Sequence, residues 1–110
     1  MTQSTAQANC HAIGGRLALV SSAQKLDAIQ AFILSKLGPK SDVWVDGSDA
    51  AIEGAWRTST GDIIRYIGWT GVEPNGGTSE NCITLRGKEV KDEGCDRGNK
   101  VIAALCEPVI

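Results

Sequence analysis

The sequence predicts an α+β domain in which two helices precede a series of short strands. Apolar residues recur at helical spacing in the first third of the chain, and short extended apolar segments separated by glycine, asparagine and aspartate follow. A length of 110 residues suits one hydrophobic core, and 42% apolar against 22% charged residues is typical of a folded protein. We therefore expect one domain that spans residues 1–110.

The first predicted helix begins at Ser4, whose hydroxyl can cap the helix while Gln7 completes a capping box. Gly14 and Gly15 end this helix. The next segment, Leu17–Val20, is expected to be extended, although so short an apolar run has no diagnostic period.

The second predicted helix begins at Ser21 or Ser22, with Gln24 in the corresponding box position. It ends at Gly38 and Pro39, because glycine tolerates a left-handed cap and proline cannot continue the hydrogen-bond ladder. Spacings of three and four residues predict one apolar stripe along it, made of Leu26, Ile29, Ile33 and Leu37.

The remainder of the chain predicts short strands joined by turns. The expected strands are Val43–Val45, Ile63–Tyr66, Cys82–Leu85 and Val101–Cys106. Between them, the section Gly68–Glu80 contains four glycines and one proline and has little apolar content. Loops of this length are usually functional or disordered.

The charge and the cysteines limit the binding partners and the location to be expected of this chain. A formal net charge of −2 provides no general basic surface for nucleic acid, and no apolar run is long enough to insert across a membrane. The first ten residues lack the features of a signal peptide, so we expect a mature fragment.

Four cysteines, none spaced as Cys-x-x-Cys, indicate disulfides and a secreted, extracellular location. Three pairings remain open, of which a nested arrangement is the simplest.

Oxygen-bearing side chains gather in and after the long section. Glu73-Pro74-Asn75 lies within it, Glu80 precedes Cys82, and Asp92 precedes Cys95. Calcium prefers six to eight hard oxygen ligands from such side chains, backbone and water. A Cys82–Cys95 disulfide would place Glu80 and Asp92 on neighbouring strands, at one end of a sheet.

A series of motifs runs along nearly the whole chain. They are Cys10-x-x-x-Gly14-Gly15-x-Leu17-Ala18, Trp44-Val45-Asp46-Gly47, Glu53-Gly54-x-Trp56, Trp69 before Glu73-Pro74-Asn75, Glu80-Asn81-Cys82, Asp92 before Cys95, and Ala104-Leu105-Cys106-Glu107. Together they resemble the C-type lectin-like domains, specifically the calcium-dependent carbohydrate-recognition domains that carry Glu-Pro-Asn. The resemblance implies two helices, antiparallel sheets, a long calcium-binding loop and two disulfides, Cys10–Cys106 and Cys82–Cys95.

The resemblance also implies a Ca²⁺ site. By position, the metal ligands are Glu73, Asn75, Glu80 and Asp92, and the carbohydrate-binding residues are these four together with Lys91. The family has an asparagine where this chain has Lys91, and an ammonium cannot ligate a metal. Calcium binding is therefore expected to be weaker, and Lys91→Asn is expected to restore an oxygen ligand.

The implied function is calcium-dependent binding of mannose-, glucose- or fucose-type glycans in innate immune or cell-surface recognition. Two neighbouring sugar hydroxyls would replace water on the ion, donating to carboxylates and accepting from amides. The family's auxiliary calcium site would fall near Asp49, Glu53, Glu80 and Asn81, but Gly76 stands where an acidic ligand is usual. An open edge on the last strand would leave room for a homo-oligomer.

Two other functions, a glycosidase and a calcium-independent binding module, are alternatives to this one. Glu73 and Glu80 could serve as a glycosidase acid and base, but so small a domain has little room for a deep cleft, so we do not expect an enzyme. The alternative function is a calcium-independent protein-binding module with a degenerate metal site, which Lys91 favours. Most simply, Lys88–Lys91 and Asp92-Glu93 would form a charged hairpin surface.

Overall fold

A computed structural model describes residues 1–71, 80–96 and 101–108. Its elements run in the order α1 (Gln3–Ala12), β1 (Gly15–Leu17), α2 (Ala23–Leu37), β2 (Asp42–Ser48), β3 (Cys82–Arg86), β4 (Glu89–Glu93), β5 (Val101–Ala104) and β6 (Cys106–Pro108). The α+β prediction is confirmed. None of the helices in these ranges is long and apolar enough to cross a bilayer.

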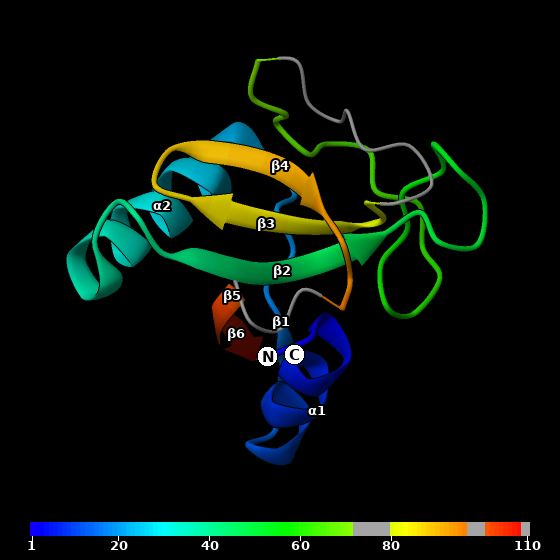
Figure 1. Ribbon diagram of the computed structural model, residues 1–110, viewed down its shortest axis with the longest axis horizontal. Coiled ribbons are helices and arrows are strands. Elements are labelled where there is room, and N and C mark those ends of the chain that lie inside the picture. Colours follow the sequence, from blue (N-terminus) through cyan, green and yellow to red (C-terminus); the bar gives the residue numbers. More distant parts are fainter. Residues whose placement is uncertain (72–79, 97–100, 109–110) are drawn as a thin grey trace.

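Two sheets form the centre of the molecule (Figure 1). The larger has the strand order β4-β3-β2-β5, in which only β2 and β5 run parallel, and the smaller pairs β1 with β6. Side chains alternate between the faces of a strand. Val43 and Val45 pack in the cluster that contains α2 residues, whereas Trp44 packs with Ala6 and Cys10 of α1. The two helices therefore cover opposite faces of the larger sheet.

The helix ends differ in detail from the predicted ones. Thr2, not Ser4, caps α1, since its side-chain oxygen accepts the N–H of Thr5 at 3.2 Å and Ser4 lies inside the first turn. Ser22 caps α2 by accepting the N–H of Lys25 at 3.1 Å. A capping box needs Glu or Gln three residues after the cap, and from Ser22 that residue is Lys25. The predicted capping box with Gln24 therefore does not form. The ends at Gly14 and Gly38 are confirmed, with φ of 82° and 84°.

The apolar stripe of α2 is one turn shorter than predicted. Leu26, Ile29 and Ile33 are buried against the sheet. Leu37 is the last residue of the helix and remains 43% exposed.

Three strand predictions need correction. Ile63–Tyr66 is not a strand, because only Ile63 makes a bridge, to Arg57, and its side chain faces solvent. The first short strand is Gly15–Leu17 and does not extend to Val20. The last predicted strand divides at Leu105, whose N–H donates to Trp44 in the larger sheet and whose carbonyl accepts from Ala18.

Both disulfides have the implied pairing. Cys10–Cys106 joins α1 to β6, and Cys82–Cys95 joins the start of β3 to the turn after β4. Cys10 and Cys82 are almost completely buried.

Candidate functional site

The predicted ligands fall into two groups. Glu73 and Asn75 lie in residues 72–79, outside the described part of the chain. Glu80, Lys91 and Asp92 are described. Lys91 and Asp92 lie on β4, but Glu80 lies two residues before β3 and so is not on a strand as expected.

Both ends of the segment that contains Glu73 and Asn75 are attached to strands. Before it, the N–H of Thr70 donates to the Val90 carbonyl at 3.0 Å, and the N–H of Val90 donates to the Thr70 hydroxyl at 2.8 Å. After it, the Asn81 carbonyl accepts the N–H of Asp49 at 3.0 Å, just beyond β2. Thr70 is therefore tied to β4, and Asn81 is tied to the chain just beyond β2.

Asp92 is a buried carboxylate at the end of β4. Only 3% of it is exposed, and it lies opposite Ile83 in the β3–β4 register. Because Asp92 has the same parity as Val90, it is on the α2 face of the sheet. Glu93 is equally buried, so the expected charged hairpin surface is wrong for these two carboxylates.

Lys91 lies on the opposite face from Asp92. Its ammonium is 3.7 Å from the Asp42 carboxylate, and the two side chains are 15% and 4% exposed. Asp42 is two residues from Trp44 and shares its face, which is the α1 face. The structure therefore pairs the predicted lysine with the first residue of β2 and does not place it beside Asp92. The sequence did not indicate that Asp42 contacts Lys91, because the two residues are almost half the chain apart.

Two buried carboxylates, Asp49 and Asp92, act on the exposed Glu53. Asp49 is almost completely buried and accepts the N–H of Gly54 at 2.9 Å through Oδ2, while its Oδ1 has no hydrogen-bond partner among the described residues. Desolvation, then the charge of Asp49 and a side-chain hydrogen bond with it, and last the charge of Asp92, raise the pKa of the exposed Glu53 carboxyl.

The donor chemistry suits calcium, since carboxylate and amide oxygens are hard ligands. Within the described residues, however, no group of three or more Asp, Glu, His or Cys side chains is arranged to hold a metal. A complete shell in the predicted site therefore requires Glu73 and Asn75 in addition to Glu80 and Asp92.

Asp46 is a buried carboxylate that organises the neighbouring loop. Its two oxygens accept the N–H of Ser59, each at 3.1 Å. Burial raises the pKa of Asp46 above its ordinary 3.8, although hydrogen bonds from Ser59 and Gly47 oppose the shift.

The raised pKa of Asp46 predicts a specific pH dependence. The native state disfavours ionisation, so the contribution of Asp46 to stability is fully present below pH 3.8 and is lost as the pH rises through the native pKa. Asp46→Asn does not ionise. We expect its melting temperature, relative to the unaltered protein, to rise between pH 3.5 and pH 6, measured by circular dichroism. A constant difference over that range would contradict the shift.

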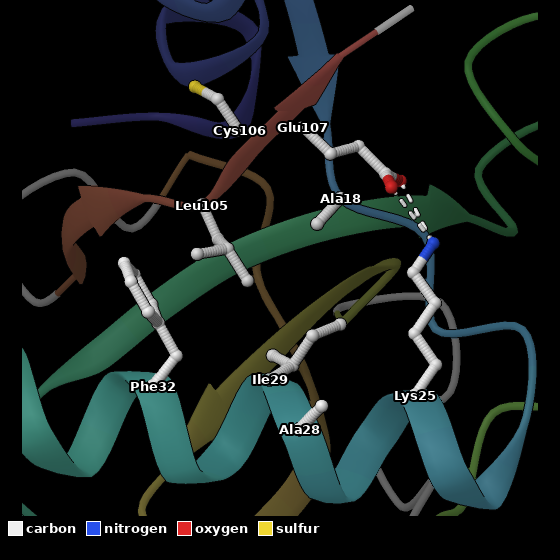
Figure 2. A pocket seen from close by; sticks show the side chains of 8 residues that line it. All are labelled: Ala18, Lys25, Ala28, Ile29, Phe32, Leu105, Cys106 and Glu107. Carbon is white, nitrogen blue, oxygen red and sulfur yellow. Dashed lines mark hydrogen bonds and ion pairs between the residues drawn. The ribbon is translucent and has the colours of Figure 1, made fainter. Parts of the chain in front are cut away.

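A separate groove lies between α2 and β6 (Figure 2). It has a volume of about 340 Å³, and its lining is mostly apolar, with Phe32 and Leu105 among the contributing side chains. At one end, the Lys25 ammonium contacts Glu107 at 2.9 Å, and the same carboxylate accepts the N–H of Leu19 at 2.7 Å. This ion pair ties α2 to the smaller sheet, and the groove contains none of the predicted ligands.

Comparison with known proteins identifies the fold family. Residues 1–107 match the sequence profile of the Lectin C-type domain. The chain belongs to this family. Tetranectin of Bos taurus is 34% identical over 85 residues, covering 74% of this chain and 42% of that protein. Ladderlectin of Oncorhynchus mykiss is 33% identical over 85 residues, covering 76% and 45%. The chain thus spans less than half the length of these two relatives.

Solved C-type lectin structures agree with this assignment. The carbohydrate-recognition domain of the mouse scavenger receptor C-type lectin superimposes with a TM-score of 0.75 at 19% identity, covering 86% of this chain and 72% of that one. A calcium-independent type II antifreeze protein superimposes with a TM-score of 0.72 at 30% identity, covering 86% and 71%. The same C-type lectin fold therefore occurs both in a carbohydrate-recognition domain and in a calcium-independent protein.

Proposed function

We propose that residues 1–110 form a calcium-dependent carbohydrate-recognition domain that binds mannose-, glucose- or fucose-type glycans. The observation that carries the proposal is the buried Asp92 carboxylate on β4, the strand to which Thr70 is hydrogen-bonded shortly before Glu73 and Asn75 in the sequence. Family membership supports the same function. Two disulfides favour an extracellular setting. The role we propose there is innate immune or cell-surface recognition.

In this function, Glu73, Asn75, Glu80 and Asp92 would hold the ion. Bound calcium would supply open coordination positions for two neighbouring sugar hydroxyls. The carboxylates can only accept hydrogen bonds, so they would receive the hydroxyl protons. The Asn75 amide can donate as well as accept, so it would bond a hydroxyl oxygen. The order of glutamate before asparagine in the motif favours mannose-type glycans.

Mannose-agarose provides the test. We expect the protein to be retained in millimolar Ca²⁺ and released by EDTA or by free mannose, while galactose-agarose retains much less. Calorimetric titration with calcium alone separates loss of the metal from loss of sugar recognition. Absence of calcium binding together with absence of retention would contradict the proposal.

The second candidate function is a calcium-independent protein-binding module. Two observations favour it: the Lys91 ammonium is paired with Asp42, so it adds no ligand, and a calcium-independent antifreeze protein shares 30% identity with this chain. Retention on a ligand that persists in EDTA would support this candidate. Neither candidate is an enzyme, and the family itself is a binding family.

Self-association remains a prediction. In the described part of the chain, β6 pairs with β1 on one side only, and an open strand edge can pair with another copy. Size-exclusion chromatography with light scattering tests it, and a monomer at all accessible concentrations would contradict it.

A further inference from the structure

The basis of the inference is one end of the larger sheet, where three segments of the chain meet. β2 starts, β3 ends and β4 starts at this end, because β2–β3 and β3–β4 are antiparallel pairs. The chain just after α2 lies there too, since a Cβ added to Gly87, in the β3–β4 turn, would be 2.9 Å from the Pro39 carbonyl oxygen. Figure 1 shows the end of α2, the start of β2 and the β3–β4 turn together at the left of the view.

Basic side chains predominate at this end of the sheet, which we call the basic end and define as residues 36–42 and 86–91. These residues include five basic and two acidic side chains, which leaves six basic and eleven acidic ones for the rest of the chain. Asp42 is neutralised by Lys91. Four basic side chains make no ion pair with any described residue, namely Lys36, Lys40, Arg86 and Lys88. Three of them, the lysines, are exposed.

The other end of the sheet is acidic. Asp49 follows β2 directly, and Asp92 and Glu93 are the last two residues of β4. The seven residues of β2 separate the two ends by about 20 Å, whereas charges in water are screened within about 8 Å at physiological ionic strength. A charged partner at the basic end therefore meets the local positive charge and not the overall charge of −2.

We propose that the basic end is a docking surface for a sulfated polysaccharide. One exposed ion pair contributes little binding energy, so cations spread over three segments favour a polymer with repeated negative charges over a small anion. In the extracellular setting that the disulfides favour, sulfated polysaccharides carry such charges, whereas anionic lipid is concentrated in the cytoplasmic leaflet. This surface needs no metal and does not rest on the proposed calcium site.

Binding to immobilised heparin in EDTA and 50 mM NaCl tests the surface. Lys40→Gln and Lys88→Gln should each weaken binding by about two- to fivefold, and together by more than about tenfold. The matched control is Arg65→Gln, which removes the same charge from an exposed position near Ser21, at the other end of α2. It should change the affinity by less than about 1.5-fold. Glu89→Gln removes the exposed acidic residue of the basic end and should strengthen binding about twofold.

Equal losses in Lys40→Gln and Arg65→Gln would overturn the proposal, because total charge and not the basic end would then govern binding. Absence of heparin binding by the unaltered protein would also overturn it. Desulfated heparin should bind at least about tenfold more weakly; equal binding to it, or tighter binding to phosphatidylserine vesicles or single-stranded DNA, would exclude a sulfated polysaccharide as the partner. Circular dichroism checks that each variant is folded. Free mannose should leave heparin binding unchanged, so failure on mannose-agarose would contradict the proposed function without affecting this test.

Discussion

Replacing Cys10 and Cys106 together with alanine is expected to lower the free energy of unfolding by about 4 to 5 kcal/mol. This disulfide joins residues separated by 96 positions, and in the chain-entropy description a cross-link stabilises more as the loop that it closes grows. Domains of this kind typically have only about 5 to 15 kcal/mol of stability. The variant should therefore be close to unfolding at 37 °C. Urea unfolding in EDTA, followed by tryptophan fluorescence, measures the loss.

The second disulfide provides the matched comparison. Cys82–Cys95 closes a separation of only 13 residues, so its replacement by two alanines should cost less, about 3 kcal/mol. Calcium affinity should show the reverse order, because Glu80 lies two residues before Cys82 and Asp92 lies on β4, three residues before Cys95. Equal losses of stability, or a larger loss from the shorter loop, would contradict the entropic explanation.

Local signals in the sequence predicted much of the fold. Ser22 and Gly38 bound α2 because capping depends on chemistry within a few residues. Ile63–Tyr66 was misassigned because β-propensity does not reveal whether a partner strand exists, and only a single bridge forms there. The motifs of the C-type lectin family predicted both disulfide pairings, which spacing alone left open.

The candidate site was predicted less completely. The motif located Asp92, but the orientation of Lys91 follows from the β3–β4 register and from an acidic partner on β2. No local pattern encodes a contact between positions 42 and 91. Long-range pairing thus decides where the Lys91 side chain lies, which the motif alone does not.

Asp92→Asn is expected to weaken calcium binding by more than about 100-fold, since loss of an outer-shell partner alone costs about 10- to 100-fold. The substitution preserves the shape of the side chain but removes one of the three carboxylates, Glu73, Glu80 and Asp92, proposed to hold the ion. Calcium stabilises the native state in proportion to the logarithm of its concentration over Kd. The rise in melting temperature on adding millimolar Ca²⁺ should therefore disappear in this variant.

The control for Asp92→Asn is Asp27→Asn, which removes the same charge from the exposed face of α2. It should keep both the calcium-dependent rise in melting temperature and retention on mannose-agarose. Because Asp92 is buried, each variant is first compared in EDTA, where circular dichroism reports whether the fold is intact. A folded Asp92→Asn protein that binds calcium as well as the control would exclude Asp92 from the ligand set. The proposed ligand set would then lose its carboxylate from position 92, and the calcium-independent function would become the better explanation of the fold.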